Sequence, residues 1–169
     1  TIPDSVTAIE DYVFARCYNL TSVTIGSRVT TIGSYAFYDC EFLTTVTIPT
    51  GVTSIGNCAF LRCYSLASVS IPFSVNGIGI NAFEDCDSLT SVTIPASVTT
   101  IGDYAFAYCD SLTSVFFAGP SPFHYDFPVF DSSPATIYYL PAFAPYWPSY
   151  FGTRPTKLWN PAFTGTALA

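Results

Sequence analysis

The sequence predicts a solenoid of stacked coils, with a parallel β-sheet on one face, short helical or 3₁₀ turns on the other and an irregular C-terminal cap. The first observation is a Leu-x-x-Val-x-Ile motif that returns every 23 residues, with Phe replacing Ile in its last copy. The second is that four further columns keep the same interval over five registers without an insertion. One such coil cannot bury its apolar side alone, so the coils stack and bury it against their neighbours.

The repeated columns are apolar, as this kind of stacking requires. The strand motifs begin at Leu20, Leu43, Leu66, Leu89 and Leu112. The other columns are Val6, Val29, Val52, Val75 and Val98; Ile9, Ile32, Ile55, Ile78 and Ile101; Phe14, Phe37, Phe60, Phe83 and Phe106; and Cys17, Cys40, Cys63, Cys86 and Cys109.

Each motif predicts a β-strand because its side chains alternate between the two sides of a pleat. In the first copy Leu20, Val23 and Ile25 point inward, whereas Ser22 and Thr24 point outward. Strands of neighbouring coils then pair in parallel, about 4.8 Å apart. The motif therefore places apolar columns in the core and small hydroxyl side chains on the surface.

The other side of each coil has the pattern Ile-Gly-x-x-Ala-Phe-x-x-Cys-x-x-Leu in its most regular copies. Spacings of three to five residues suit a single helical or 3₁₀ turn rather than a long helix. A glycine precedes this turn in four coils, and we expect a positive φ angle there. These glycines are Gly33, Gly56, Gly79 and Gly102.

Composition limits the class of function. The chain has 5 Lys and Arg against 12 Asp and Glu, a net charge of −7, which argues against a nucleic-acid partner. It has no run of about 18 apolar residues, so we predict no membrane span. Only 10% of its residues are charged, which argues against disorder. Because the chain contains no Met and no signal peptide, we expect a processed product or a fragment.

The repeat unit also resembles a known family. The unit from Ile94 to Leu112, Ile-Pro-Ala-Ser-Val-Thr-Thr-Ile-Gly-Asp-Tyr-Ala-Phe-Ala-Tyr-Cys-Asp-Ser-Leu, is similar to the BspA-like leucine-rich repeat. The resemblance covers residues 1–118, which we divide into five 23-residue repeats. It implies a leucine-rich-repeat solenoid located outside the cell or at its surface, in bacteria or protists. It also implies adhesion, since several family members bind host or matrix proteins.

Residues 119–169 are predicted to form Pro- and aromatic-rich capping coils. Residues 135–141 and 156–159 are predicted strands that extend the sheet by two irregular coils. A terminal repeat differs from the others because it would otherwise expose its whole face. The segment is also similar to terminal segments of secreted bacterial arrays. Its aromatic residues either pack over the last coil or form a surface platform for a sugar or a partner. They are Tyr138, Tyr139, Phe143, Tyr146, Trp147, Tyr150, Phe151 and Trp159.

The cysteine column predicts buried, unbridged thiols. Its members keep the register of the core columns, and a free Cys behaves as a small apolar residue. Side chains stacked along a ladder point the same way, which suits the torsion of a disulfide poorly. Cys58 departs from the column, and we expect it to be more exposed and the most reactive thiol. Its spacing of five from Cys63 does not fit a zinc site.

No catalytic, cofactor-binding or metal-binding residue is predicted. His124 and Asp126 suggest a catalytic pair, but no Ser or Cys nucleophile lies in a recognisable elbow. Acidic residues around Asp85, Asp87 and Asp110 suggest a calcium site, but the glycine and spaced carboxylates of a calcium loop are lacking. We interpret them as a solvated acidic edge.

The outward hydroxyl columns are the predicted binding face. Small hydroxyl residues also stack well in parallel strands for purely structural reasons. As a function, a flat and uncharged strip suits a protein partner, a glycan or a regular solid such as ice, and the family resemblance favours a protein. The residues are Ser22, Thr24, Thr45, Thr47, Ser68, Ser70, Ser91 and Thr93.

The sequence therefore predicts a non-enzymatic module, extracellular or at the cell surface, that binds a protein partner through its repeat face. The alternative is a structural subunit that stacks head to tail into an extracellular filament. That alternative rests on apolar residues of the first coil, which we expect to face water, and on an apolar C-terminal segment. The residues assigned to self-association are Val6, Ile9, Phe14 and Leu168.

Overall fold

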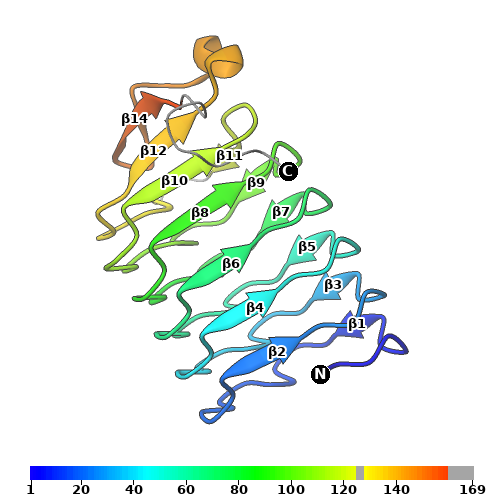
Figure 1. Ribbon diagram of the computed structural model, residues 1–169. Helices are drawn as coiled ribbons and strands as arrows, with labels where there is room; N and C mark the ends of the chain where they lie inside the picture. Colours follow the sequence, from blue (N-terminus) through cyan, green and yellow to red (C-terminus); the bar gives the residue numbers. More distant parts are fainter. Residues whose placement is uncertain (125–127, 160–169) are drawn as a thin grey trace.

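The computed structural model describes residues 1–124 and 128–159, which form a β-solenoid of stacked coils (Figure 1). Strands lie along two long sides of the solenoid. The first side contains β2 (Ser22–Thr24), β4 (Thr45–Thr47), β6 (Ser68–Ser70), β8 (Ser91–Ile94), β10 (Ser114–Phe117), β12 (Thr136–Tyr139) and β14 (Arg154–Leu158). The second contains β1 (Ala8–Ile9), β3 (Thr31–Ile32), β5 (Ser54–Ile55), β7 (Gly77–Ile78), β9 (Thr100–Ile101) and β11 (Phe123–His124). Strand β13 (Tyr150–Phe151) and the 3₁₀ helix η1 (Pro141–Tyr146) complete the C-terminal end.

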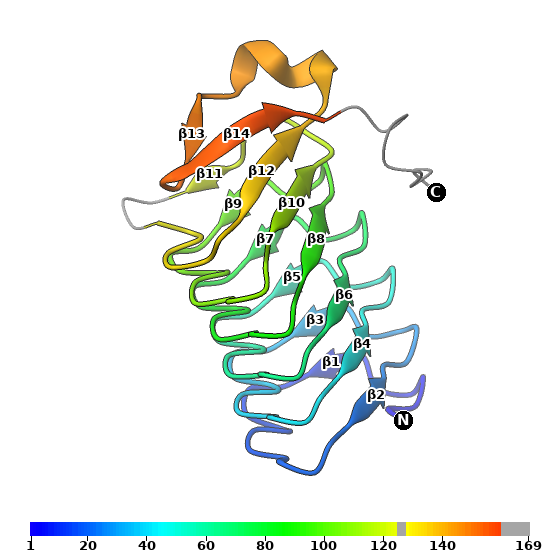
Figure 2. The same ribbon diagram turned by 60° about the vertical axis from the view of Figure 1, so that its left-hand side comes forward.

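The predicted fold class is confirmed, because strands of successive coils pair in parallel at the repeat interval. Thr45 of β4, for example, lies between Ser22 of β2 and Ser68 of β6. The second side is one continuous sheet, in the order β1-β3-β5-β7-β9-β11. The first side is divided into two sheets, β2-β4-β6 and β13-β14-β12-β10-β8, and among the described strands only β13 and β14 pair antiparallel. Figure 2 shows the two sides facing each other across the core.

The third side of the coils differs from the helical or 3₁₀ turn that the spacing predicts. In the described repeats it consists of turns whose alternate N–H groups donate to the next coil. The Tyr12 N–H donates to the Ser34 carbonyl (3.0 Å), and the Phe14 N–H donates to the Ala36 carbonyl (2.9 Å). Left-handed backbone at Tyr12 and Arg16, with φ of 63° and 60°, accompanies this pattern in the first coil and recurs in the later ones. A helical turn would need the same N–H groups within its own coil.

The glycine column allows close approach of the coils rather than the predicted positive φ angle. Gly33, Gly56, Gly79 and Gly102 do not have positive φ, so that expectation is wrong. Instead, the coils approach so closely that no Cβ atom fits between them. A Cβ on Gly79 would lie 2.6 Å from the Asn57 backbone nitrogen.

Substitution at one of these glycines should therefore destabilise the fold. A Cβ on Gly102 would collide with the Ile80 backbone nitrogen, so we expect Gly102→Ala to cost about 1–3 kcal/mol. Gly77→Ala is the matched control, because its Cβ would meet only the Thr100 hydroxyl, at 3.2 Å. We expect that variant to be neutral or up to about 1 kcal/mol more stable. Denaturation midpoints measure both, and equal effects would contradict the close-approach argument.

The core follows the predicted columns. Phe37, Phe60, Phe83 and Phe106 have no solvent exposure, and their rings stack with centroids 5.1–5.2 Å apart. The first coil is less exposed than expected. Ile9 is only 3% exposed, which corrects the prediction that it faces water.

This difference arises because side chains of the first coil lean onto the second coil. The Phe14 ring stacks on Phe37 at 5.2 Å, and Val6 and Cys17 are half-buried rather than open to water. Ile2 also packs into the first coil and is 8% exposed. Leu168 lies outside the described residues.

The C-terminal coils cover the end of the array. Strand β12 pairs in parallel with β10, and β14 pairs in parallel with β12. The Phe117 ring contacts Trp147 at 4.8 Å and Phe151 at 5.5 Å, and both of these side chains are buried. We propose on these contacts that the segment caps the array. The boundary between residues 118 and 119 stays a prediction.

Candidate binding face of the solenoid

The candidate site is the outward side of β2, β4, β6 and β8, which we call the strand face. All eight predicted hydroxyl residues are exposed there, two on each strand. Within the described chain, none of these eight hydroxyl groups has a hydrogen-bond partner. The structure thus places the predicted residues together on one surface.

The column just before the strands behaves differently. The Thr44 hydroxyl donates to the Thr21 carbonyl (3.0 Å), and the Thr113 hydroxyl donates to the Thr90 carbonyl (3.4 Å). Threonine side chains of this flanking column therefore form hydrogen bonds between neighbouring coils. The hydroxyl groups of the strand face remain available to a ligand.

The strand face is interrupted between β6 and β8, where the ladder of backbone pairs stops. A hollow of about 330 Å³ lies there, lined by Ser68, Val69, Ser70, Ile71, Ser91, Val92 and Thr93. Four of the predicted hydroxyl residues therefore surround a depression rather than a flat strip.

A second and larger hollow, of about 530 Å³, lies beside the first at the carboxyl ends of the strands. Its wall includes Ile48, Pro72, Phe73 and Pro95. Phe73 is 75% exposed and was not among the predicted residues. The sequence could have indicated Phe73, because it is a large aromatic residue where the equivalent positions 23 residues away hold the small residues Thr50 and Ala96.

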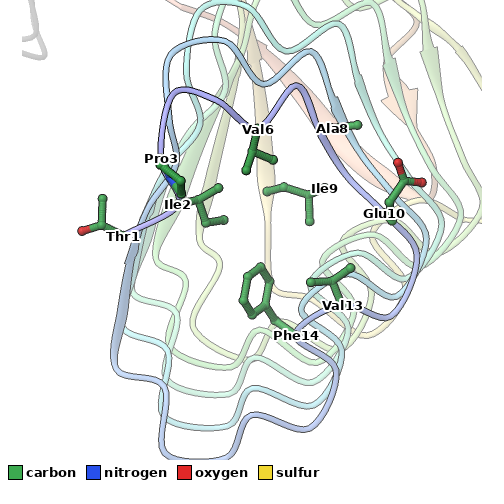
Figure 3. Close-up of a pocket in the computed structure, with 9 residues that line it drawn as sticks. All are labelled: Thr1, Ile2, Pro3, Val6, Ala8, Ile9, Glu10, Val13 and Phe14. Carbon is green, nitrogen blue, oxygen red and sulfur yellow. The ribbon is translucent and has the colours of Figure 1, made fainter.

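A third hollow, of about 270 Å³, lies in the first coil on the side away from the second coil (Figure 3). Val6, Ile9 and Phe14, all assigned to self-association, line it together with Val13. Val13 is 53% exposed. In this hollow Val13 is exposed, Val6 and Phe14 are half-buried and Ile9 is buried, and the role of these residues in self-association stays a prediction.

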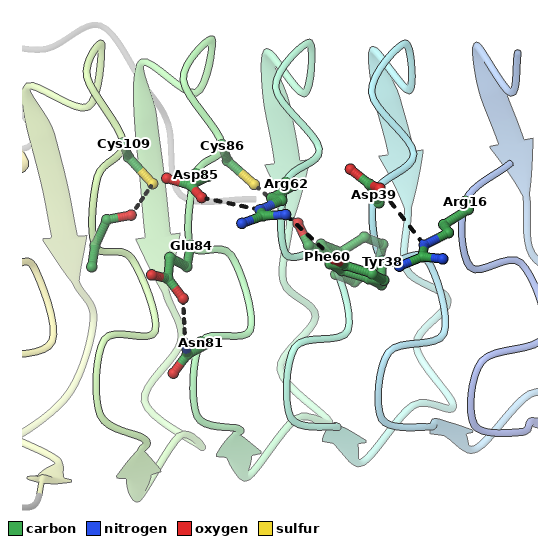
Figure 4. A network of polar contacts seen from close by, with 11 residues as sticks. Arg16, Tyr38, Asp39, Phe60, Arg62, Asn81, Glu84, Asp85, Cys86 and Cys109 are labelled. Atoms are coloured by element: carbon green, nitrogen blue, oxygen red, sulfur yellow. Dashed lines mark hydrogen bonds and ion pairs between the residues drawn. The ribbon is translucent and has the colours of Figure 1, made fainter. Parts of the chain in front are cut away.

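Ion pairs link neighbouring coils along the turn side (Figure 4). Arg16 Nε lies 3.9 Å from Asp39 Oδ2, and Arg62 Nε lies 3.7 Å from Asp85 Oδ2. Such exposed pairs contribute at most about 1 kcal/mol each. The predicted acidic edge is therefore partly paired with arginine, through Asp85. Among the described residues there is no group of three or more His, Cys, Asp or Glu side chains that could hold a metal ion.

The cysteine column is buried and unbridged, as predicted, at Cys40, Cys63, Cys86 and Cys109. Each thiol donates to a carbonyl of an earlier coil; the Cys109 Sγ, for example, lies 3.1 Å from the Phe83 oxygen. Figure 4 shows two of these thiols. Each of these thiols therefore has a carbonyl acceptor and remains free of a disulfide.

Cys58 is 7% exposed, slightly more than Cys40, Cys63, Cys86 and Cys109, which have no exposure, but it is still buried, and the half-buried Cys17 is the more open thiol. Cys58 lies beside Tyr35, and the hydrogen bond between the two side chains raises the pKa of Tyr35 to about 12. Burial raises the pKa of Cys58, which lowers its thiolate fraction and its reactivity.

Because its cysteine thiols are buried, the folded protein should lose stability at alkaline pH. Burial raises the pKa of Cys40 to about 11 and that of Cys109 to about 12. An unfolded thiol ionises near about pH 8.5, so above this pH the unfolded state loses protons that the folded state keeps. Stability is thus full below about pH 8 and falls as pH rises toward 11. Denaturation midpoints at pH 7 and 10 in reductant measure this fall, which should be smaller in Cys40→Ala/Cys109→Ala. An equal fall in the double variant would show that Cys40 and Cys109 do not cause the alkaline loss of stability.

The C-terminal aromatic residues divide into core and surface. Trp147, Phe151 and Trp159 are buried, whereas Tyr146 and Tyr150 are exposed. His124 ends strand β11, and its proposed companion Asp126 lies outside the described residues. Among the described residues, no helix has the length and apolar character needed to cross a bilayer.

A family profile agrees with this geometry. The profile of the BspA type leucine rich repeat region matches residues 1–113 in six copies. The chain belongs to the BspA type leucine rich repeat family. The BspA type array presents columns of similar residues along its length. No curated protein matches the chain by sequence.

Crystal structures of bacterial proteins share the BspA type fold. A leucine-rich repeat protein from Bacteroides ovatus is 36% identical, with a TM-score of 0.70 over 79% of this chain and 35% of that one. The T. pallidum leucine rich repeat protein is 38% identical, with a TM-score of 0.65 over 66% of this chain and 52% of that one. The pneumococcal vaccine antigen PcpA, 15% identical with a TM-score of 0.53 over 86% of this chain and 43% of that one, shows the fold alone. This chain thus spans 35% and 52% of the lengths of the first two.

Proposed function

We propose that this BspA type solenoid is a non-enzymatic binding module, outside the cell or at its surface, that recognises a protein partner through the strand face. The observation that carries the proposal is the set of eight exposed hydroxyl groups on four adjacent strands, which have no hydrogen-bond partner among the described residues. The adjoining apolar hollow supports it, since a few residues packed into pockets that exclude water provide most of the affinity at interfaces. The family resemblance supports the location and a protein ligand, with a glycan as the competing ligand.

The test uses the full chain against a panel of matrix proteins (fibronectin, fibrinogen, laminin and collagen) and against a glycan array. We expect binding to at least one protein, lost in Ser22→Arg/Thr45→Arg, because two large charges would then stand on the strand face. Thr100→Arg is the matched control, an exposed position in β9 on the second side. Binding to glycans alone, or equal losses in both variants, would contradict the proposal.

A second candidate function is end-to-end assembly of copies into a filament. The hollow of the first coil is apolar, and the opposite end of the solenoid exposes Tyr146, Tyr150 and Leu158. The ends also differ in charge, with Glu10 beside the hollow and Lys157 in β14. Contacts between unlike ends do not close on themselves unless the rotation makes a ring, so they build fibres.

Sedimentation and electron microscopy test this candidate. Val13→Asp should abolish assembly without unfolding the chain, since the side chain is already 53% exposed. Ile9→Asp is unsuitable, because it would bury a charge. Ile80→Asp is the control, at an exposed position in an inner coil. A concentrated wild-type sample that stays monomeric would exclude the filament.

A further inference from the structure

The two hollows of the strand face form one continuous depression. The hollow between β6 and β8 and the larger hollow share Ser70, Ile71 and Thr93 in their walls. The depression therefore begins where the sheet divides and continues to the carboxyl ends of the strands. Its total size is in the range of about 300–1,000 Å³ that is common for ligand sites.

The depression begins where the sheet of the first side is divided. Strands β4 and β6 share a parallel ladder, as do β8 and β10, but no ladder joins β6 to β8. Backbone N–H and C=O groups of the facing strand edges are thus not paired with each other in the regular way. Strands β6 and β8 remain neighbours, however, so the polar groups that the depression offers to a peptide main chain are the wall hydroxyls of Ser68, Ser70, Ser91 and Thr93.

Phe73 is an exposed aromatic residue in a column of small residues. Its column contains Ser27, Thr50, Ala96 and Gly119 in the neighbouring coils, so the fold has no need of a large side chain there. The ring is 75% exposed and forms one wall of the larger hollow. Aromatic side chains beside a pocket are typical of the few residues that provide most of the affinity at an interface.

The chemistry of the walls selects the occupant. No Asp, Glu, Lys or Arg lines either hollow, although the chain has a net charge of −7, so the site suits an uncharged ligand. No Asn or Gln lines them either, and the polar side chains there are Ser and Thr hydroxyls. A sugar has many hydroxyl groups to satisfy and would meet few fixed polar partners. An apolar peptide side chain fits the Ile, Pro and Phe surface.

We propose that this depression is the specificity pocket of the strand face and binds an extended, uncharged peptide segment whose apolar side chain packs against Phe73. The proposal rests on the function proposed above and names the part of the partner that is recognised. The hydroxyl groups of Ser70 and Thr93 bond to the peptide main chain. The large hollow takes the side chain.

The probes are capped nonapeptides of Gly, Ser and Thr with Leu, Ile or Phe at the centre. The comparison probes are the same peptides with Glu or Lys at the centre and, as an uncharged sugar, maltoheptaose. NMR titration of the labelled full chain follows the amide signals of Ser70 and Thr93. We expect the apolar peptides to shift these signals at millimolar concentration or below, and the charged peptides and the sugar to leave them unchanged.

Two variants and a control localise the effect. Phe73→Ala should weaken peptide binding at least tenfold, and Ala96→Phe, which fills the larger hollow, should weaken it as well. Phe42→Ala is the matched control, because that ring is also exposed, at 55%, and lines neither hollow. Equal binding by Phe73→Ala and the wild type, or signals shifted by the sugar alone, would overturn the proposal.

Failure of this inference is distinguishable from failure of the proposed function. Ser22 and Thr45 lie outside both hollows. If Ser22→Arg/Thr45→Arg loses a matrix protein that Phe73→Ala still binds with wild-type affinity, the strand face is the binding site and the pocket is not its anchor. If neither variant affects that binding, both proposals are wrong.

Discussion

Removal of residues 134–169 should convert the remaining chain into an aggregating protein. In the full chain Leu112, Val115 and Phe117 are 0–1% exposed, and β12 pairs with the edge of β10. The truncation would expose these side chains, each worth about 1.5–3 kcal/mol when buried, together with an unpaired strand edge. Apolar surface beside an open edge favours association with other copies. Light scattering and size-exclusion chromatography measure the outcome.

A shorter truncation is the matched control. Deletion of residues 160–169 leaves β14, β13 and the buried rings of Trp147 and Phe151 in place. We expect this variant to stay as soluble as the full chain. If the chain that ends at residue 133 is also a soluble monomer, the C-terminal segment is not a cap, and the division of the chain at residue 118 loses its physical basis.

The repeat interval made most of the fold predictable. Burial in a solenoid places the same side chain at the same depth in every coil, so the Phe and Cys columns appear directly in the sequence. Cys63 and Phe60 were predicted to be buried for this reason, and both have no exposure. The outward hydroxyl residues follow from the same alternation.

The turns were not predictable in this way because their conformation depends on bonds between coils. The N–H groups of Tyr12 and Phe14 reach the next coil, and this pattern accompanies left-handed backbone at residues such as Tyr12 that normally avoid it. The residue types therefore indicate neither the bonds nor the angles. The glycines, which suggest left-handed backbone by type, are used for close approach instead.

The candidate site shows the same limit. The eight hydroxyl residues were found from their period, but the division of the sheet between β6 and β8 has no counterpart in the hydroxyl pattern. Phe73 was missed because a search for repeats emphasises what recurs. The informative residue was the one that departs from its column. In a repeat protein, periodic residues mainly hold the coils together, whereas exceptions at exposed positions are better candidates for recognition.

Replacement of Phe60 by Ala should be among the most damaging single substitutions in this chain. The ring has no exposure and stacks between Phe37 at 5.2 Å and Phe83 at 5.1 Å, nearly parallel to both. Loss of such a side chain costs about 3–5 kcal/mol, because a cavity remains between rigid neighbours. In a solenoid each coil contacts only the next, so the cavity also weakens the coupling between the two halves of the array.

Denaturant unfolding of three variants tests this argument. Phe60→Ala should lower the free energy of unfolding by about 4 kcal/mol and broaden the transition as the halves uncouple. Phe60→Leu, which keeps most of the volume, should cost about 1.5 kcal/mol and provides a measurement if the Ala variant does not fold. Phe42→Ala, at a ring that is 55% exposed, should stay within about 0.5 kcal/mol of the wild type. Equal losses at Phe60 and Phe42 would mean that the stacked rings do not hold the coils together, and that stability lies mainly in the backbone ladders.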